Sequence, residues 1–230
     1  MSIVPSLTET VAVTAPGLLV GATAWCSHPA DLDVERVGGT KNPDVARILA
    51  LRPDLVVANA EENRAVDLDA LRAAGVAVWT TAPETVEQAL RSLDRMLAAC
   101  RLDRPGWLDE AEAAWAVPPP ERRRTAVVPI WRRPWMAVGR GTFTGDVLRR
   151  LGVDNALAGS TERYPKVRLD ELPPHELVVL PDEPYAFRAD DGPEAFPGVP
   201  AALVSGRHLT WYGPSLVEAP AVLRRQLAVS

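Results

Sequence analysis

The sequence predicts an α/β fold with two lobes of mostly parallel sheet, a single connecting helix and a ligand cleft between the lobes. Over the first hundred residues, short apolar runs alternate with helical segments, which is the pattern of a parallel α/β layer. A proline-rich, charged stretch at 118–124 then interrupts the chain, and strands and helices resume after it. We therefore expect a first lobe at 1–100, a connecting helix and linker at 101–120, and a second lobe at 121–230.

In the first lobe the apolar runs predict strands, and the segments between them predict helices. Asn42 is expected to cap the second helix, with Pro43 at its first position. Apolar residues at 86, 89, 90, 93 and 97 form one helical stripe. The expected strands are 2–5, 18–23, 54–58 and 76–80, and the expected helices are 7–15, 43–51, 67–74 and 84–99.

The connecting helix and the second lobe follow the same logic. Thr142 or Thr144 should cap a helix that ends before Gly152. Pro214 should open a C-terminal helix that Pro220 kinks. The expected strands are 125–130, 176–180 and 201–204, and the expected helices are 109–115, 141–151 and the segment from 214 onward.

Composition bounds the function. The chain has 230 residues, 47% hydrophobic and 24% charged, which is typical of a globular protein. Its net charge of -5 gives no general attraction to nucleic acid or to an anionic membrane. No run of 18 apolar residues predicts a membrane span, and Cys26 and Cys100 are expected as free thiols without a zinc cluster. The start MSIVPSLTET lacks a secretory signal pattern, so a cytoplasmic location stays open beside an extracytoplasmic one.

The segment PIWRRPW at 129–135 carries two Trp and two Arg residues between prolines. Arg is almost never fully buried unless it is paired, so we expect a rigid surface loop that offers flat faces and positive charge. The alternative is a strand edge whose Trp residues cover the sheet while the Arg residues stay solvated. Either Arg132 or Arg133 could face a ligand, because neighbours in an extended segment point to opposite sides.

Aromatic residues gather in the loops that follow the predicted strands. Parallel sheets bind ligands outside the carboxyl ends of their strands. Rings and guanidiniums at such places predict a site for a large, flat ligand with polar or anionic edges. Nine of the 13 aromatics lie in these loops, namely Trp25, Trp131, Trp135, Phe143, Tyr164, Tyr185, Phe187, Trp211 and Tyr212.

Catalysis finds less support in the sequence. His28 lies near Cys26, but no third group is visible that would orient a nucleophile and base pair. His28 could instead contact a ligand or its metal axially, or make a loop hydrogen bond. The run GRGTFTG at 139–145 lacks the lysine of a phosphate-binding loop. We therefore expect no catalytic residue and no enzyme.

The motifs PSLTE, WCSHP, GGTKNPD, ILALRPDLVVA and TVEQAL occur in this order over residues 2–98. In this the chain resembles the class III periplasmic substrate-binding proteins of ABC transporters. The likeness is greatest to the cobalamin-binding branch, with the ferric-siderophore and haem binders as relatives. The second half resembles the family mainly in layout, through WRRPWMAVG and GTFTGDVLRRLG. The connecting helix of this chain has room for about 13 residues, fewer than the about 20 typical of the family.

The resemblance implies that aromatics of both lobes hold a corrin or chelate, and that one glutamate on each lobe docks onto a permease. Glu61 or Glu62 and Glu183 match the docking positions, and His28 is a candidate axial metal ligand. No intrinsic cofactor is implied. The matching ligand-binding positions are Ser6, Trp25, His28, Lys41, Trp131, Arg133, Trp135, Phe143, Tyr164, Tyr185 and Trp211.

These expectations give three hypotheses for function. The leading one is a monomeric, extracytoplasmic binding protein that hands cobalamin, or next a ferric siderophore or haem, to an ABC importer. The second is a cytosolic protein that handles or senses a corrinoid or metal chelate with the same fold. The third is an enzyme acting on such a ligand.

Overall fold

The computed structural model describes residues 1–229 and divides into two compact units. The first unit comprises Met1–Ala82, Ala89–Asp109 and Tyr212–Pro214, and the second comprises Pro83–Gln88, Glu110–Trp211 and the segment from Ser215 onward. Both units contain parallel strands and helices, so the predicted α/β class is confirmed. The chain passes between the units within α4 (Val86–Ala99) and within α5 (Gly106–Trp115), so each of these helices contributes residues to both.

The first unit is built on a parallel sheet. β1 (Gly21–Ala22) pairs with β2 (Glu35–Arg36), and β3 (Leu55–Asn59) pairs with β4 (Ala77–Thr81). Ser2 joins the two pairs through parallel bridges to Ala22 and Val57. The order across the sheet is therefore β2, β1, Ser2, β3, β4. Successive strands are added on one side of Ser2 as β1 and β2, and then on its other side as β3 and β4. In doubly wound sheets, a crevice opens at the carboxyl edge where the strand order changes sides in this way.

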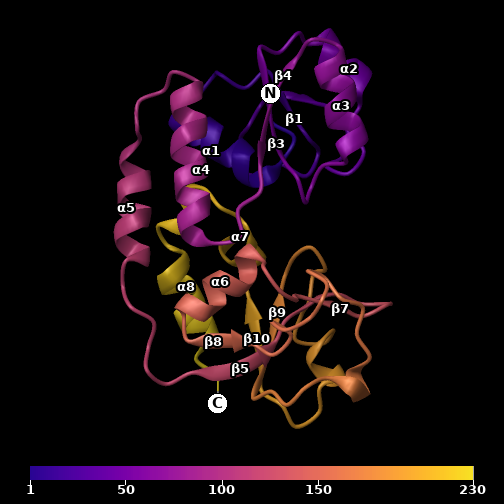
Figure 1. The fold of residues 1–230 in the computed structure, drawn as a ribbon, viewed down its shortest axis with the longest axis vertical. Helices are drawn as coiled ribbons and strands as arrows, with labels where there is room; N and C mark the ends of the chain where they lie inside the picture. Colours follow the sequence, from indigo (N-terminus) through magenta and orange to yellow (C-terminus); the bar gives the residue numbers. More distant parts are fainter. Residues whose placement is uncertain (230) are drawn as a thin grey trace. The chain divides into compact units, whose positions relative to one another are not determined.

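Two short helices lie side by side on the first unit, α2 (Val45–Ala50) and α3 (Ala65–Ala73) (Figure 1). Their buried residues Ile48, Leu68 and Leu71 join Ile3 and Val56 of the sheet in one hydrophobic cluster. Burial of this apolar surface, rather than helix propensity, accounts for helices as short as six residues.

Two predicted helix starts of the first unit need correction. Asp44, and not Asn42, caps α2, because its carboxylate accepts a bond of 2.9 Å from the Arg47 N–H, and Pro43 stays outside the helix in a bridge to Gly38. α1 (Pro5–Thr14) begins at Pro5, where proline fits because the first helical position has no N–H to satisfy. The stripe predicted for α4 is confirmed, since all its apolar residues are buried.

The second unit has a parallel sheet of order β10, β9, β5, β8, with helices α6 (Phe143–Arg150) and α8 (Ala219–Leu227) packed on its outer strands (Figure 1). Thr142 caps α6 by accepting a bond of 3.1 Å from the Gly145 N–H, as predicted. The strands are β5 (Arg124–Val127), β8 (Val153–Asn155), β9 (Leu177–Pro181) and β10 (Ala201–Val204).

Shorter elements complete the second unit. β6 (Pro129–Trp131) and β7 (Met136–Ala137) form an antiparallel hairpin, and α7 (Gly206–Thr210) precedes α8. Pro214 opens only the 3₁₀ turn Pro214–Leu216, and Pro220 lies in the first turn of α8. The predicted kink is therefore wrong, because a proline in the first turn removes no helical hydrogen bond. Two more 3₁₀ turns span Leu169–Glu171 and Pro193–Ala195.

Tyr212 closes the carboxyl edge of the sheet in the first unit. Asn59, the last residue of β3, donates a bond of 2.5 Å to the phenol oxygen. The Thr81 hydroxyl, at the end of β4, lies 2.7 Å from the same oxygen and donates its own proton to the Ala58 carbonyl, so Tyr212 donates to Thr81. Burial raises the pKa of Tyr212 to about 12.

Gly213 follows Tyr212 and rests against α1. A Cβ at this position would lie 2.7 Å from the Thr10 hydroxyl and 3.1 Å from the Ser6 carbonyl oxygen, so a side chain does not fit. The chain therefore needs glycine next to Tyr212 to bring the ring to the sheet. Tyr212 therefore lies at the carboxyl ends of β3 and β4, and Gly213 lies against α1.

The Tyr212 phenol predicts a loss of stability in alkali. Its folded pKa of about 12 lies above the unfolded value of 10. The contribution of the protonated phenol to the free energy of unfolding is therefore fully present below pH 10. It is lost as the pH rises to about 12, and this loss amounts to about 2–3 kcal/mol. Urea unfolding from about pH 8 to pH 12 measures it. Tyr212→Phe should lose less stability over this range than the parent.

At neutral pH the same variant should be about 1–2 kcal/mol less stable, because Asn59 and Thr81 lose their shared partner. Tyr164→Phe, at a half-buried tyrosine of the second unit, is the matched control and should keep the alkaline loss of the parent. If the unfolding free energies of the parent and of Tyr212→Phe fell equally between about pH 8 and pH 12, the alkaline loss would not come from Tyr212.

Candidate functional site

The segment 129–135 consists of β6 and the four-residue turn at 132–135 that leads into β7, so its first three residues are a strand and the rest a loop. Trp131 ends β6 and pairs with Met136, with an irregular register after Pro129. Trp131 keeps 43% of its surface exposed, whereas Trp135 is half-buried and packs against a hydrophobic cluster of the second unit. The two tryptophans therefore differ in role, since only Trp131 presents a broad face to solvent.

A set of five rings, here called the aromatic cluster, supports that exposed face. Trp131 meets Tyr185 edge-to-face, with ring centroids 5.8 Å apart and planes at 80°. Tyr185 contacts Phe187 at 4.7 Å, and Trp135 stacks on Phe187 at 6.0 Å with planes only 4° apart. Phe196 completes the cluster edge-on to Trp135 at 5.5 Å. Such offset and edge-to-face pairs fix ring orientation beyond what apolar burial requires.

Arg132 ties the hairpin to the loop that carries the rest of the cluster. Its guanidinium forms ion pairs with Asp191 and, at 2.5 Å, with Glu194. It also lies over the Trp135 ring, 5.2 Å from the centroid. Asp191 in turn accepts a bond of 2.6 Å from the Tyr185 hydroxyl. One half-buried cation therefore holds both sides of the aromatic cluster, an arrangement called here the Arg132 clamp.

The charges of the Arg132 clamp are mutually stabilised. The hydrogen bond from Tyr185 lowers the pKa of Asp191, with a further contribution from Arg132. The backbone N–H of Gly192 lowers the pKa of Glu194, and Arg132 adds to this effect. The same bond to Asp191 raises the pKa of the Tyr185 phenol. Both carboxylates are therefore ionised and the phenol is protonated at neutral pH.

Arg133 is the solvent-facing member of the Arg pair. It is exposed, it adopts a left-handed backbone with φ of 69°, and its charge contributes to lowering the pKa of Asp191. No hydrogen bond or ion pair engages its side chain among residues 1–229, whereas Arg132 is engaged by two carboxylates.

No protein-family model matches the chain. The vitamin B12-binding protein of Salmonella paratyphi A is 26% identical over an alignment of 176 residues that covers 66% of this chain and 60% of that protein. The periplasmic vitamin B12 binding protein BtuF of Vibrio cholerae has a TM-score of 0.76 and 18% identity over 98% of this chain and 94% of that chain. The chain resembles the class III substrate-binding proteins, as its sequence predicts.

A second solved structure, the periplasmic heme-binding protein BhuT with two hemes, has a TM-score of 0.78 and 23% identity over 98% of this chain and 96% of that chain. At these identities the structural likeness shows the fold. The chain spans about 60% of the length of the first curated relatives that it matches. The likeness in fold to the two solved structures covers 98% of this chain.

In the second unit, the other positions suggested by the likeness to class III substrate-binding proteins differ in exposure. Phe143 begins α6 and is only 5% exposed, and Trp211 is 8% exposed, which leaves a ligand little of either ring to contact. Tyr164 is half-buried. Glu183 is half-buried and packs on Gly206, where an added Cβ would lie 2.2 Å from the glutamate Cγ.

In the first unit, the suggested positions are likewise unequal. Trp25 is 71% exposed, the highest value among the large hydrophobic side chains of the described residues. The His28 ring lies 3.1 Å from the Ser27 hydroxyl and is half-buried. Lys41 donates to the carbonyl of Glu61, which ties two loops together. Ser6 is buried beneath Gly213 and offers no open surface.

The loop with the predicted docking glutamates is ordered by Asn59. Its side-chain oxygen accepts bonds of 2.7 Å from the Glu61 N–H and 3.1 Å from the Glu62 N–H. Glu62 is exposed and Glu61 is half-buried, so Glu62 is the more accessible of the two. The Asn59 side chain therefore fixes the backbone of this turn.

Sequence reasoning missed the two carboxylates of the Arg132 clamp. Asp191 and Glu194 lie about 60 residues from Arg132, in an acidic loop with no motif. The only available signal was the opposite charge of the two loops, which is too common to identify a pair. Within residues 1–229 no group of three or more His, Cys, Asp or Glu side chains could hold a metal ion.

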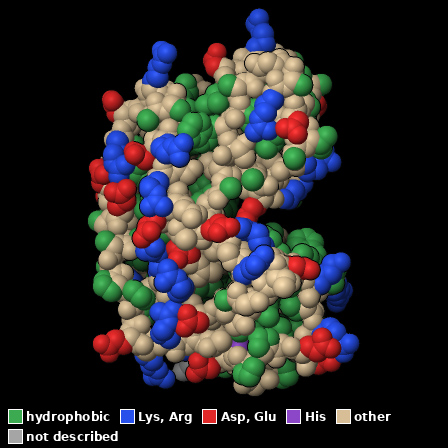
Figure 2. All heavy atoms as spheres, viewed as in Figure 1, with side chains coloured by type: hydrophobic (Ala, Val, Ile, Leu, Met, Phe, Trp, Pro, Cys, Tyr) green, Lys and Arg blue, Asp and Glu red, His purple; other side chains and the backbone are tan. Residues whose placement is uncertain are grey.

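Charged side chains of both signs lie on the surface of the protein. Figure 2 shows Lys and Arg side chains interspersed with Asp and Glu on the face in view, without a patch of one sign. Among the described residues, no helix has the length and apolar character needed to cross a membrane.

Replacing Arg132 should loosen the aromatic cluster. Arg132→Met removes both ion pairs and the contact over Trp135, and leaves two ionised carboxylates close together. We expect a loss of about 1–3 kcal/mol in unfolding free energy and a weaker near-ultraviolet dichroism of the tryptophans. Urea unfolding and circular dichroism measure the two effects.

Arg133→Met is the matched control, because Arg133 is exposed and its side chain makes no hydrogen bond or ion pair among residues 1–229. It should change stability by less than about 0.5 kcal/mol and leave the dichroism unaltered. Equal effects of the two substitutions would contradict the Arg132 clamp.

Proposed function

We propose that this chain is a substrate-binding protein that holds a planar, metal-centred ligand against the exposed face of Trp131. The observation that carries the proposal is a large ring kept 43% exposed yet fixed by Tyr185 beneath it. A rigid exposed aromatic face gives a flat ligand contact area without loss of side-chain freedom on binding. The exposed guanidinium of Arg133, two residues along the chain, suits a carboxylate or amide edge of the ligand.

The favoured ligand is a cobalamin-type corrinoid, with a ferric siderophore or haem next. Support comes from the names of the similar proteins, which bind vitamin B12 or heme. Trp25 and His28 form a second candidate contact surface, in the first unit, and His28 is the candidate axial ligand of the metal. The ligand is carried and released unchanged, so the protein needs neither a catalytic residue nor an intrinsic cofactor.

In this proposal the protein works outside the cytoplasm as a monomer and delivers its ligand to an ABC permease. Glu62, with Glu61 beside it, and Glu183 are the proposed docking residues. The turn that Asn59 fixes presents Glu62 to solvent, which suits a preformed contact with a basic partner surface.

Titration tests the proposal directly. Cyanocobalamin, hemin and a ferric siderophore such as ferrichrome are added to the full chain, and tryptophan fluorescence and calorimetry report binding. We expect at least one to bind with a micromolar dissociation constant or tighter. Trp131→Ala should weaken that binding by about tenfold or more, which corresponds to about 1.4 kcal/mol.

Val117→Ala is the matched control, because Val117 is also an exposed apolar residue of the second unit and lies outside the aromatic cluster. It should leave the affinity unchanged, and both variants should keep their thermal stability. The proposal fails if none of the three ligands binds more tightly than millimolar, or if Trp131→Ala binds as the parent does.

A further inference from the structure

The loop at 23–34 carries Trp25 and His28, and it joins β1 to β2 without a helix or strand of its own. β1 and β2 pair in parallel, with Ala22 opposite Arg36, so the chain leaves the sheet at the end of β1 and returns to the start of β2. The last residue of β2 is therefore the neighbour of the last residue of β1. This register places Arg36 beside the point where the loop begins.

The Arg36 guanidinium donates three hydrogen bonds to backbone carbonyls of this loop. Its Nη1 donates to the Thr23 carbonyl at 3.1 Å and to the Cys26 carbonyl at 2.9 Å. Its Nη2 donates to the Leu32 carbonyl at 2.9 Å. Because the guanidinium is planar and its N–H groups have fixed directions, the three carbonyls are held at set positions. One half-buried side chain therefore holds the loop at its start, at the turn that follows and near its end.

Trp25 lies inside a turn that Arg36 holds at both ends. The Cys26 N–H donates to the Thr23 carbonyl at 3.2 Å, which closes a four-residue turn at 23–26, here called the Trp25 turn. The Thr23 hydroxyl and the Cys26 thiol lie 3.1 Å apart across the same turn. Cys26 is only 1% exposed, so without Arg36 its carbonyl would be buried without this donor, which is unfavourable.

The Trp25 ring has little packing of its own to hold it. It is 71% exposed, and its indole nitrogen lies beside Gly39, where an added Cβ would be 3.5 Å away. The Trp131 ring differs, because its contact with Tyr185 orients it. A ring that is mostly in solvent takes its place from the backbone that carries it. The position of the Trp25 ring therefore depends on the Trp25 turn.

From these contacts we infer that Arg36 is a positioning residue, which holds the Trp25 turn in the form that meets a ligand. The inference rests on the proposed function, in which Trp25 is a candidate ligand contact of the first unit. A ligand that meets a preformed turn loses no free energy to ordering it, so Arg36 raises the affinity without touching the ligand. The guanidinium itself is engaged by the three carbonyls.

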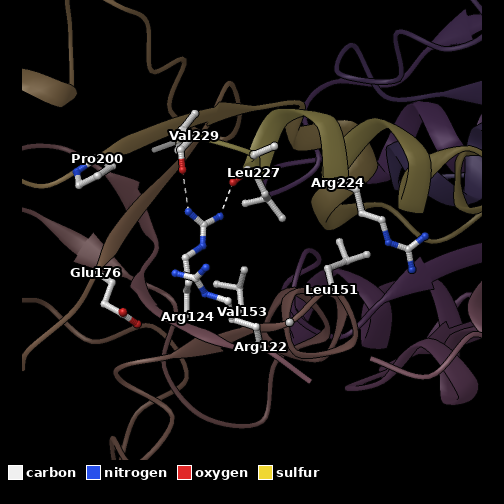
Figure 3. A pocket seen from close by; sticks show the side chains of 11 residues that line it. Arg122, Arg124, Leu151, Val153, Glu176, Pro200, Arg224, Leu227 and Val229 are labelled. Atoms are coloured by element: carbon white, nitrogen blue, oxygen red, sulfur yellow. Dashed lines mark hydrogen bonds between the residues drawn. The ribbon is translucent and has the colours of Figure 1, made fainter. Parts of the chain in front are cut away.

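Arg124 makes the same type of contact in the second unit. It is half-buried at the start of β5, beside a cavity, and donates to the carbonyls of Leu227 and Val229 at the end of α8 (Figure 3). These bonds join a helix end to a strand and do not involve the Trp25 turn. Arg124→Met is therefore the matched control for the loss of guanidinium–carbonyl bonds as such.

Amide hydrogen exchange of the full chain without ligand tests whether Arg36 orders the loop. The N–H groups of Ala24, Cys26 and Leu32 are hydrogen-bonded to backbone carbonyls, so their exchange reports opening of the loop. Arg36→Met should speed this exchange about tenfold or more, whereas Arg124→Met should leave it unchanged. Arg36→Lys keeps the charge but not the planar fork and should have a smaller effect, and it replaces Arg36→Met if that variant does not fold.

Titration with cyanocobalamin, hemin and ferrichrome tests the effect on binding. For the probe that the parent binds most tightly, Arg36→Met should weaken the affinity about tenfold and Arg124→Met less than about twofold. A double substitution separates positioning of the ring from a general loss of structure. If Arg36 acts through Trp25, the chain with both Trp25→Ala and Arg36→Met should bind about as Trp25→Ala alone does. Thermal unfolding checks that each variant is folded.

Four outcomes overturn the inference: loop exchange in Arg36→Met equals that of the parent, this variant binds as the parent does, its loss of affinity persists in full beside Trp25→Ala, or Arg124→Met has the same effects. A parent chain that binds none of the three probes contradicts the proposed function instead. The exchange measurement needs no ligand, so in that case it decides alone whether Arg36 holds the turn.

Discussion

The Arg132 guanidinium, shared between Asp191 and Glu194, is the interaction on which the candidate ligand face depends. It joins two loops that are distant in the chain, and it does so beside a ring, where partial desolvation strengthens each ion pair. Tyr185 is oriented through Asp191, and Trp131 is oriented through Tyr185. Trp131 is therefore exposed to solvent, yet its contact with Tyr185 holds the ring in one orientation. A fixed aromatic face of this kind suits a flat ligand.

The first unit illustrates the opposite use of an aromatic residue. Tyr212 occupies the carboxyl edge of the sheet, where a doubly wound arrangement would leave a ligand crevice. Its phenol is buried, fully hydrogen-bonded and held protonated by a pKa of about 12. In this unit Tyr212 therefore stabilises the fold at the ends of β3 and β4, whereas the Trp25 ring stays exposed.

Arginine has three distinct functions in the second unit. Arg132 orders aromatic rings, Arg124 neutralises the end of α8, and Arg133, Arg122 and Arg224 remain available to solvent. The same residue type can take all three because its planar fork binds carboxylates, carbonyls and ring faces alike. Arginines that are engaged by hydrogen bonds and ion pairs hold the unit together, and the exposed ones carry positive charge on its surface.

The sequence by itself determined the α/β class, the strand 201–204, a threonine cap at 142 or 144 and the buried stripe of α4, because these follow from local periodicity and capping chemistry. Only the tertiary structure decided which aromatic residues are exposed and which arginine is free. Those properties depend on partners about 60 residues away, such as Asp191, and no local pattern encodes such pairs. The same holds for Tyr212, because this residue bonds to Asn59 and Thr81 only after the folded chain has returned to the first unit.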